Sequence, residues 1–362
     1  MKRRTFIQAA AATPLLAALP RAFAQQLPFQ PQPGPWKTYE IVTRVDVMKP
    51  AGLTQAWIPL PSVNGDYQRV EGDTWTGNAS SAKVESDGKY GARMLHAQWA
   101  PGTKDPVVEV TSRFQTRDRA TDFSKADPRL VLEPDARRFY TSSTLLIPTD
   151  GIVRETAIKV TQGAKTDMEK ARRIYEWIVD NTFRDPKTRG CGVGDIKFML
   201  ETKNLQGKCA DLNALFVGLA RASGIPARDV YGVRVAKSQF GYRSLGAGTD
   251  NITRAQHCRA EVFLSGFGWV PVDPADVRKV VLEEKPQPTN LEDPVVPPVR
   301  KALFGSWEMN WLAYNDAHDI KLPGSKGAPV GFLMYPQLET AEGMSDCLDP
   351  DNIKYKITSK TA

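Results

Sequence analysis

The sequence predicts an all-β domain followed by a domain that mixes helices with antiparallel strands. Residues 36–120 carry short alternating apolar runs separated by Gly, Pro, Asn and Asp, which is typical of a sandwich-like β domain. Residues 209–223 instead repeat apolar side chains with the period of a helix. Residues 257–273 hold two alternating runs joined by a short turn, the pattern of a β-hairpin.

The first 24 residues have the parts of an export signal. A basic start that contains Arg3-Arg4 precedes an Ala/Leu run, and Ala22-Phe-Ala24 offers a small-x-small cleavage site. The apolar run is too short to span a bilayer. Arg3-Arg4 followed by Thr-Phe-Ile resembles the twin-arginine type of signal, so we expect a periplasmic protein cut after Ala24. Residues 25–35, rich in Pro and Gln, read as a tether.

Residues 36–120 form the predicted β domain, and residues 121–150, with three prolines, form a connector. Thr166 and Glu169 have the spacing of a capping box, which predicts that a helix begins there. The glycine-rich loop at 189–195 lacks the Gly-Lys-Ser/Thr of a phosphate-binding loop, so we expect it to border the functional site without binding a nucleotide.

Cys209 is the first residue of the predicted helix that Gly224 and Pro226 end. A thiol in the first turn lies at the positive end of the helix dipole, which lowers its pKa and makes it a nucleophile candidate. A buried structural cysteine is the alternative, because Cys209 also lies on the apolar stripe of the helix.

The hairpin supplies a base. If Asp273 pairs with Arg259 across the two strands, His257 is the diagonal neighbour of Asp273, close enough for their side chains to form a hydrogen bond. A carboxylate beside an imidazole fixes its tautomer and stabilises the imidazolium. The alternative is a partly buried histidine with a structural carboxylate partner.

Four motifs in this order resemble the transglutaminase-like superfamily. They are Gly207-Lys-Cys-Ala-Asp, Ala222-Ser-Gly-Ile-Pro-Ala-Arg, His257-Cys-Arg-Ala-Glu-Val and Gly268-Trp-Val-Pro-Val-Asp-Pro. The resemblance covers roughly residues 150–282 and implies a papain-like α+β core, in which the Cys-bearing helix packs on an antiparallel sheet. It makes Cys209 the nucleophile, His257 the general base and acid, and Asp273 the residue that orients the imidazole. Cys258 stands where many members have an aromatic residue, a change we expect to affect packing only.

The catalytic domain is therefore expected at 151–282, followed by a Pro-rich linker at 283–300. Residues 301–362 are expected to form further strands packed on the catalytic core. Cys191 and Cys347 could form a disulfide in an oxidising compartment. Gln206 is a possible second donor to an oxyanion, beside the backbone N–H of Cys209.

The balance of basic and acidic residues bears on the kind of partner that the protein binds. The chain has 48 basic and 41 acidic residues, and removal of the signal leaves 44 basic against 41 acidic. This balance does not call for a nucleic-acid partner. We expect a thiol enzyme that acts on amide bonds of a peptide or protein in the cell envelope and needs no metal or organic cofactor. Peptidase or amidase activity is favoured, transglutaminase activity is second, and an inactive peptide-binding scaffold is third.

Overall fold

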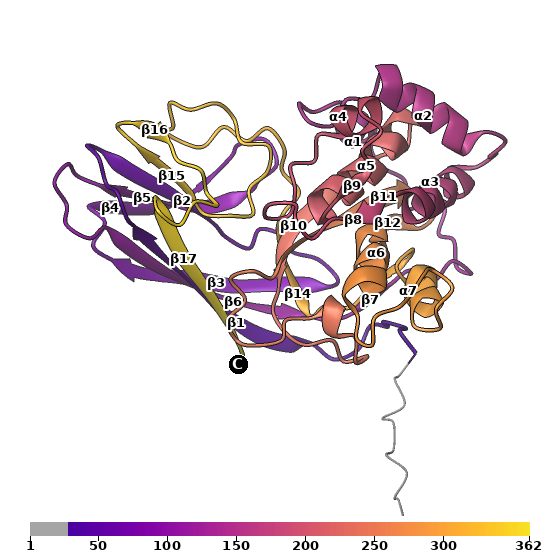
Figure 1. The fold of residues 1–362 in the computed structure, drawn as a ribbon, viewed down its shortest axis with the longest axis horizontal. Coiled ribbons are helices and arrows are strands. Elements are labelled where there is room, and N and C mark those ends of the chain that lie inside the picture. The colour runs from indigo at the N-terminus through magenta and orange to yellow at the C-terminus, as the bar shows by residue number, and fades with distance from the viewer. Residues whose placement is uncertain (1–27) are drawn as a thin grey trace, which may run out of the picture.

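The computed structural model describes residues 28–362, so the predicted signal and the first residues of the tether lie outside it. Two regions stand side by side in Figure 1, strands on the left and helices over a sheet on the right. Together they confirm the predicted α+β class with a sandwich ahead of the Cys-bearing core. Within residues 28–362 no helix has both the length and the apolar composition needed to cross a bilayer.

The sandwich consists of two antiparallel sheets that face each other across an apolar core. The first sheet has the order β17-β1-β6-β3, with strands Ile353–Thr361, Lys37–Val47, Val107–Thr116 and Gln68–Gly77. The second has the order β16-β15-β2-β5-β4, with strands Gly343–Met344, Gln337–Thr340, Thr54–Pro59, Arg93–Trp99 and Ser81–Ser86. Buried side chains alternate with more exposed ones along β1 and β6, so one face of their sheet meets the core.

The second region is built on a four-stranded antiparallel sheet of order β12-β11-β10-β14, with strands Gly268–Val272, Gln256–Leu264, Ala227–Arg234 and Trp311–Asn315. Helix α5 (Cys209–Ala222) packs on β11 and β10 of this sheet. Further helices pack against α5, chiefly α2 (Gly151–Thr161), α3 (Asp167–Asn181) and α6 (Pro274–Glu283).

Helix α5 is buried on all sides, whereas the sequence pattern predicted one apolar face. Only Ala222 of its fourteen residues is not buried. The helix ends as expected, because Gly224 takes a φ of +81° and the Ile225 N–H reaches back to the Ala220 carbonyl. Helix α3 begins with the predicted capping box between Thr166 and Glu169. A helix enclosed in this way holds its first residue in a fixed position.

Several short elements connect these parts. They are β7 (Arg119–Ala120), α1 (Pro134–Thr141), β8 (Phe183–Arg184), α4 (Ile196–Glu201), β9 (Gln206–Gly207), η1 (Arg243–Leu245), α7 (Val296–Ala302) and β13 (Ser306–Trp307). The expected connector at 121–150 thus contains α1, and the expected linker at 283–300 contains most of α7. Strands β8 and β9 pair in parallel just ahead of α5.

The expectation that residues 301–362 pack on the catalytic core is wrong for most of their strands. β14 does extend the catalytic sheet, but β15 and β16 join one sandwich sheet and β17 joins the other. β17 pairs with β1 along nine residues, from Tyr39 opposite Thr361 to Val47 opposite Ile353. This pairing satisfies the backbone groups of β1, which would otherwise be a long exposed edge.

The two regions share a core cluster. Tyr39, Ile41 and Phe114 of the sandwich pack with apolar residues of β10 and β14, which include Val233, Leu312 and Tyr314. The C-terminal strand contributes Ile357 to the same cluster. The sandwich therefore supports the sheet that carries the predicted site residues.

Candidate active site

Cys209 is the first residue of α5, where the helix leaves backbone N–H groups without intrahelical partners. The Asp211 carboxylate fixes this turn, because it accepts the N–H groups of Lys208 at 2.9 Å, Val193 at 3.0 Å and Gly194 at 2.9 Å. The glycine-rich loop is therefore tied to the helix start, as expected of a loop that borders the site.

The N–H of Cys209 is available for an oxyanion. The N–H of Lys208 is held by Asp211 and that of Ala210 by the Cys191 carbonyl at 2.9 Å. Among the described residues, no acceptor is found for the Cys209 N–H. Gln206 is exposed and does not line the cavity described below, so the structure does not place its side chain where a second oxyanion donor would be needed.

The structure brings His257 and Asp273 together. β11 and β12 pair with Ala260 opposite Val272, and continuing this register by one residue places Asp273 opposite Arg259. His257 Nε2 lies 2.7 Å from Asp273 Oδ2, as the hairpin register predicted. Because Nε2 is engaged, Nδ1 is the ring nitrogen left for a thiol partner.

Asp273 is held on its other oxygen as well. Oδ1 accepts the Asn213 side-chain amide at 3.2 Å and the Asp276 N–H at 3.1 Å. The second bond makes Asp273 the N-cap of α6, with Pro274 at the first helical position. Asn213 lies one turn after Cys209 on α5, so the helix that carries the thiol also positions the carboxylate.

Sequence reasoning missed Asp276 and Arg234. Asp276 is buried, lies 3.4 Å from His257 Nε2 and accepts two hydrogen bonds from Arg234 Nη2, at 2.6 and 2.7 Å. The Asp-Pro signature of a helix start at 273–274 could have revealed α6 and hence Asp276. No local pattern could have indicated Arg234, because it comes from the neighbouring strand β10.

The charges around His257 favour the imidazolium. Burial opposes the charged form, but Asp276 and then Asp273 more than offset burial and the nearby Arg234, and they raise the pKa of His257 to about 9. In the opposite direction, the neighbouring thiols of Cys191 and Cys258, whose sulfur atoms lie within 4.8 Å of that of Cys209, and the positive charge of His257 hold the pKa of Cys209 well below its ordinary value. The arrangement therefore stabilises a thiolate–imidazolium pair near neutral pH.

Three buried thiols meet at this point. The sulfur atoms of Cys191, Cys209 and Cys258 all lie within 4.8 Å of one another. The Cys191 proton can reach the Gln256 carbonyl at 3.3 Å or the Cys209 thiolate, and the charged acceptor is the stronger of the two. Cys258 thus contacts the reactive thiol, whereas the sequence predicted a packing role alone.

The disulfide suggested between Cys191 and Cys347 is not formed, and all four cysteines are free thiols. The bond between the Ala210 N–H and the Cys191 carbonyl holds the Cys191 backbone against the start of α5. Its sulfur is thereby placed beside Cys209.

Within residues 28–362, two groups of side chains have the spacing of metal ligands, namely the three cysteines and the set His257, Asp273 and Asp276. In the second group, hydrogen bonds from Arg234, Asn213 and His257 already occupy the carboxylate oxygens. A soft metal on the three cysteines would occupy the nucleophile itself. Neither group suits a cofactor that works together with a free Cys209 thiolate.

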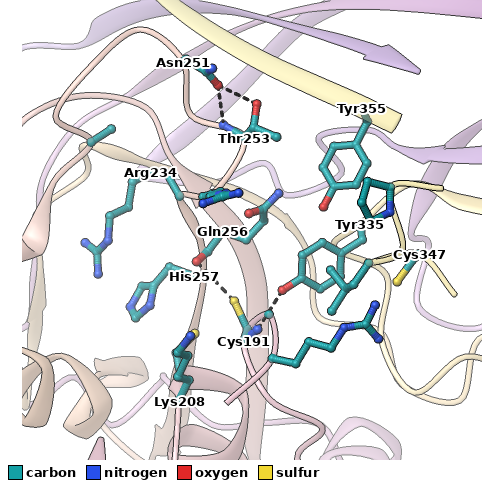
Figure 2. Close-up of a pocket in the computed structure, with 18 of the residues that line it drawn as sticks. Cys191, Lys208, Arg234, Asn251, Thr253, Gln256, His257, Tyr335, Cys347 and Tyr355 are labelled. Carbon is teal, nitrogen blue, oxygen red and sulfur yellow. Dashed lines mark hydrogen bonds between the residues drawn. The ribbon is translucent and has the colours of Figure 1, made fainter. Parts of the chain in front are cut away.

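Cys209 and His257 open into a cavity of about 660 Å³. Figure 2 shows His257, Cys191 and Lys208 around one end and Tyr335, Tyr355 and Cys347 on the other side. The loop 246–256 and the start of β17 also line it, so both regions of the molecule contribute to the walls. His96 and His318 lie outside this lining; the first bonds Glu85 and the second lies beside Asp229.

Comparisons with known proteins agree with this architecture. Residues 154–274 match the model of the transglutaminase-like superfamily. The chain is 39% identical over 339 residues to an uncharacterised protein of Haemophilus influenzae, covering 89% of this chain and 91% of that protein.

Among solved structures, the chain resembles a candidate cysteine protease from Cytophaga hutchinsonii with a TM-score of 0.50. That alignment has 14% identity and covers 91% of this chain and 99% of the other chain. It therefore supports a shared fold only. The periplasmic domain of TgpA from Pseudomonas aeruginosa aligns with a TM-score of 0.37 and 16% identity, over 70% of this chain and 73% of that domain.

A Cys-bearing helix on an antiparallel sheet, with histidine and aspartate at the hairpin, defines a family of cysteine enzymes. The chain belongs to the transglutaminase-like superfamily.

Proposed function

We propose that this protein is a cysteine-dependent hydrolase of amide bonds, with Cys209 as nucleophile, His257 as acid and base, and Asp273 as the residue that orients the imidazole. The observation that carries the proposal is the pairing of His257 with Asp273 beside a thiol at a helix start. Each of these features favours the ionised thiol over the neutral one.

The reaction has two stages. The Cys209 thiolate attacks the amide carbonyl, and the oxyanion receives a hydrogen bond from the Cys209 N–H, a type of donor whose loss typically costs about 3 kcal/mol of barrier. The imidazolium of His257 gives its proton to the departing amine, which leaves a thioester on Cys209. Neutral His257 then takes a proton from water, the hydroxide oxygen attacks the thioester, and the thiolate is released with the carboxylic acid.

Hydrolysis is favoured over transfer because water is abundant and reaches the thioester through the cavity that Cys209 and His257 line. In a transglutaminase reaction an amine would replace water in the second stage and form an isopeptide bond. An inactive scaffold would bind peptides in the same cavity without any covalent step.

We also propose that the protein works in the periplasm on a peptide or protein of the cell envelope. Support comes from the basic start with Arg3-Arg4 and the cleavage motif at 22–24, which lie outside the described residues. A variant with lysine at both arginine positions is expected to stay in the cytoplasm. Secretion of that variant at the normal level would exclude the twin-arginine route.

Trapping of the acyl-enzyme tests the catalytic proposal. Protein lacking residues 1–24 is mixed with a pool of synthetic peptides, quenched in acid and mapped by mass spectrometry. We expect an acyl group on the peptide that contains Cys209, and none in Cys209→Ala. An added primary amine that appears in an isopeptide product would favour transglutaminase activity. Equal peptide binding by both proteins, with no adduct and no product, would favour the scaffold.

A further inference from the structure

The cavity around Cys209 is lined by positive charge. Of its 24 lining residues in the described part of the chain, seven are lysine or arginine and none is aspartate or glutamate. Residues 28–362 as a whole are nearly balanced, with 44 basic and 41 acidic side chains. The excess is therefore a property of this cavity and not of the protein surface in general.

Part of this charge is neutralised from behind the walls. Arg234 is bound by Asp276, Arg189 pairs with Asp346, and both Arg184 and Lys279 reach Glu283. The remaining three, Lys208, Arg254 and Lys354, have no carboxylate within ion-pair distance among the described residues. The cavity thus keeps a net positive charge after these pairs are counted.

These cations surround the reactive thiol from more than one element. Lys208 directly precedes Cys209, and Lys279 lies on α6, one turn beyond Asp276. Arg254 comes from the loop before β11 and Lys354 from β17, so they belong to other parts of the wall. Burial, with the nearby Arg234, lowers the pKa of Lys279 to about 8, and an anion in the cavity would oppose that shift.

We infer that the substrate is an acidic peptide, with carboxylates close to the amide bond that Cys209 attacks. This inference rests on the proposed function. A low-dielectric cleft lined by one sign of charge concentrates ligands of the opposite sign and raises their association rate. Arg254 and Lys354 are then specificity-determining residues, because they are exposed and hold no carboxylate of the protein.

The inference can be tested without knowing the substrate. Iodoacetate and iodoacetamide alkylate the same thiol but differ in charge, so the ratio of their rates at Cys209, read by peptide mapping, reports the potential in the cavity. Arg254→Gln combined with Lys354→Gln is expected to lower this ratio at least about threefold at low salt. Because both reagents attack the same thiolate, any change in the ionisation of Cys209 cancels in the ratio. Added salt should lower the ratio of the parent protein in the same direction.

The control is Lys49→Gln combined with Lys104→Gln, which removes two exposed lysines that do not line the cavity. Its ratio should equal that of the parent protein. An equal ratio in the cavity variant, or an equal fall in the control, would overturn the inference while leaving the thiol chemistry intact. Failure of both reagents to label Cys209 would instead overturn the proposed function and the inference with it.

A peptide assay completes the test. In the parent protein, peptides with Asp or Glu beside the cleaved bond should have a higher kcat/KM than the same peptides with Asn or Gln. The cavity variant should lose most of this difference through KM. Cleavage with no preference for the acidic peptides would contradict the inference but support the proposed function.

Discussion

His257 lies between two carboxylates that do different things. Asp273 accepts its Nε2–H at 2.7 Å and is held in place by Asn213 and the start of α6. Asp276 lies 3.4 Å away and is the largest single influence that raises the pKa of His257. Asp273 therefore mainly sets the orientation of the His257 ring, and Asp276 provides much of the electrostatic stabilisation of its imidazolium form.

Asp276→Asn is expected to lower the pKa of His257 from about 9, because Arg234 remains beside the imidazole without its counter-ion. NMR titration of the imidazole measures this directly, and the chain has three histidines to assign. The substitution should also cost about 3–5 kcal/mol of unfolding free energy, since it leaves a buried guanidinium unpaired. Asp346→Asn, which breaks the exposed pair with Arg189, should change neither quantity appreciably.

The sign of the pH effect follows from the raised pKa. The unfolded chain has the ordinary imidazole pKa of 6.5, so the charged His257 stabilises the fold fully below that pH. This contribution is lost as the pH rises through about 9. If the pKa of His257 is the same in Asp276→Asn as in the parent protein, Asp276 is not the main group that raises the pKa of this imidazole.

Cys191 is expected to act on the reactive thiol through a hydrogen bond. Cys191→Ala removes the largest influence that lowers the pKa of Cys209, so that pKa should rise. The pH dependence of Cys209 alkylation measures the change. The pH at which alkylation of Cys209 is half-maximal should move less in Cys258→Ala, because Cys258 lowers the pKa of Cys209 less than Cys191 does. An unmoved midpoint in Cys191→Ala would show that this thiol only packs.

At the scale of elements, the glycine-rich loop and α5 form one unit through Asp211. A methyl group at Gly192 would lie 1.9 Å from Asp211 Oδ2, and Gly192 has a φ of +95°. Gly192→Ala should therefore cost roughly 2–4 kcal/mol in urea unfolding, from backbone strain and from disruption of the Asp211 bonds. It should also slow alkylation of Cys209.

Gly88→Ala is the matched control for that substitution. Gly88 also has a positive φ, of +74°, but a methyl group there would meet open space. It should therefore cost about 1 kcal/mol, the strain alone. Equal costs at the two positions would mean that contact with Asp211 contributes nothing.

The elements that local patterns specify were predictable. Strand parity, with a register that pairs Asp273 with Arg259, placed His257 beside Asp273, and helical periodicity with Gly224 gave the extent of α5. Elements defined by distant partners were not predictable, because β17 pairs with β1 about 300 residues away and Arg234 of β10 approaches Asp276 of α6. Cys191 is placed beside Cys209 by a loop with three glycines at positive φ, Gly190, Gly192 and Gly194, which no residue pattern describes.

At the scale of the whole molecule, a buried charge network joins the sandwich side to the catalytic sheet. Glu261 on β11 binds Arg119, which follows the sandwich strand β6, and Arg228 on β10 at 2.6 Å. Glu261→Gln should cost about 3–5 kcal/mol, because the buried Arg119 guanidinium loses its carboxylate, while the half-buried Arg228 keeps Asp316 as a partner. Glu71→Gln, which breaks the exposed pair with Arg113, should cost less than about 1 kcal/mol. Similar urea midpoints for the two variants would contradict the role of this network.

The most direct test of the central claim is the rate of Cys209 alkylation by iodoacetamide as a function of pH, in the parent protein and in His257→Gln. We predict that the parent reacts at Cys209 at a pH well below the ordinary thiol pKa of 9.0, and that the midpoint moves to higher pH in His257→Gln. The same midpoint in both proteins, or labelling at another cysteine in place of Cys209, would contradict the thiolate–imidazolium pair on which the proposed function depends.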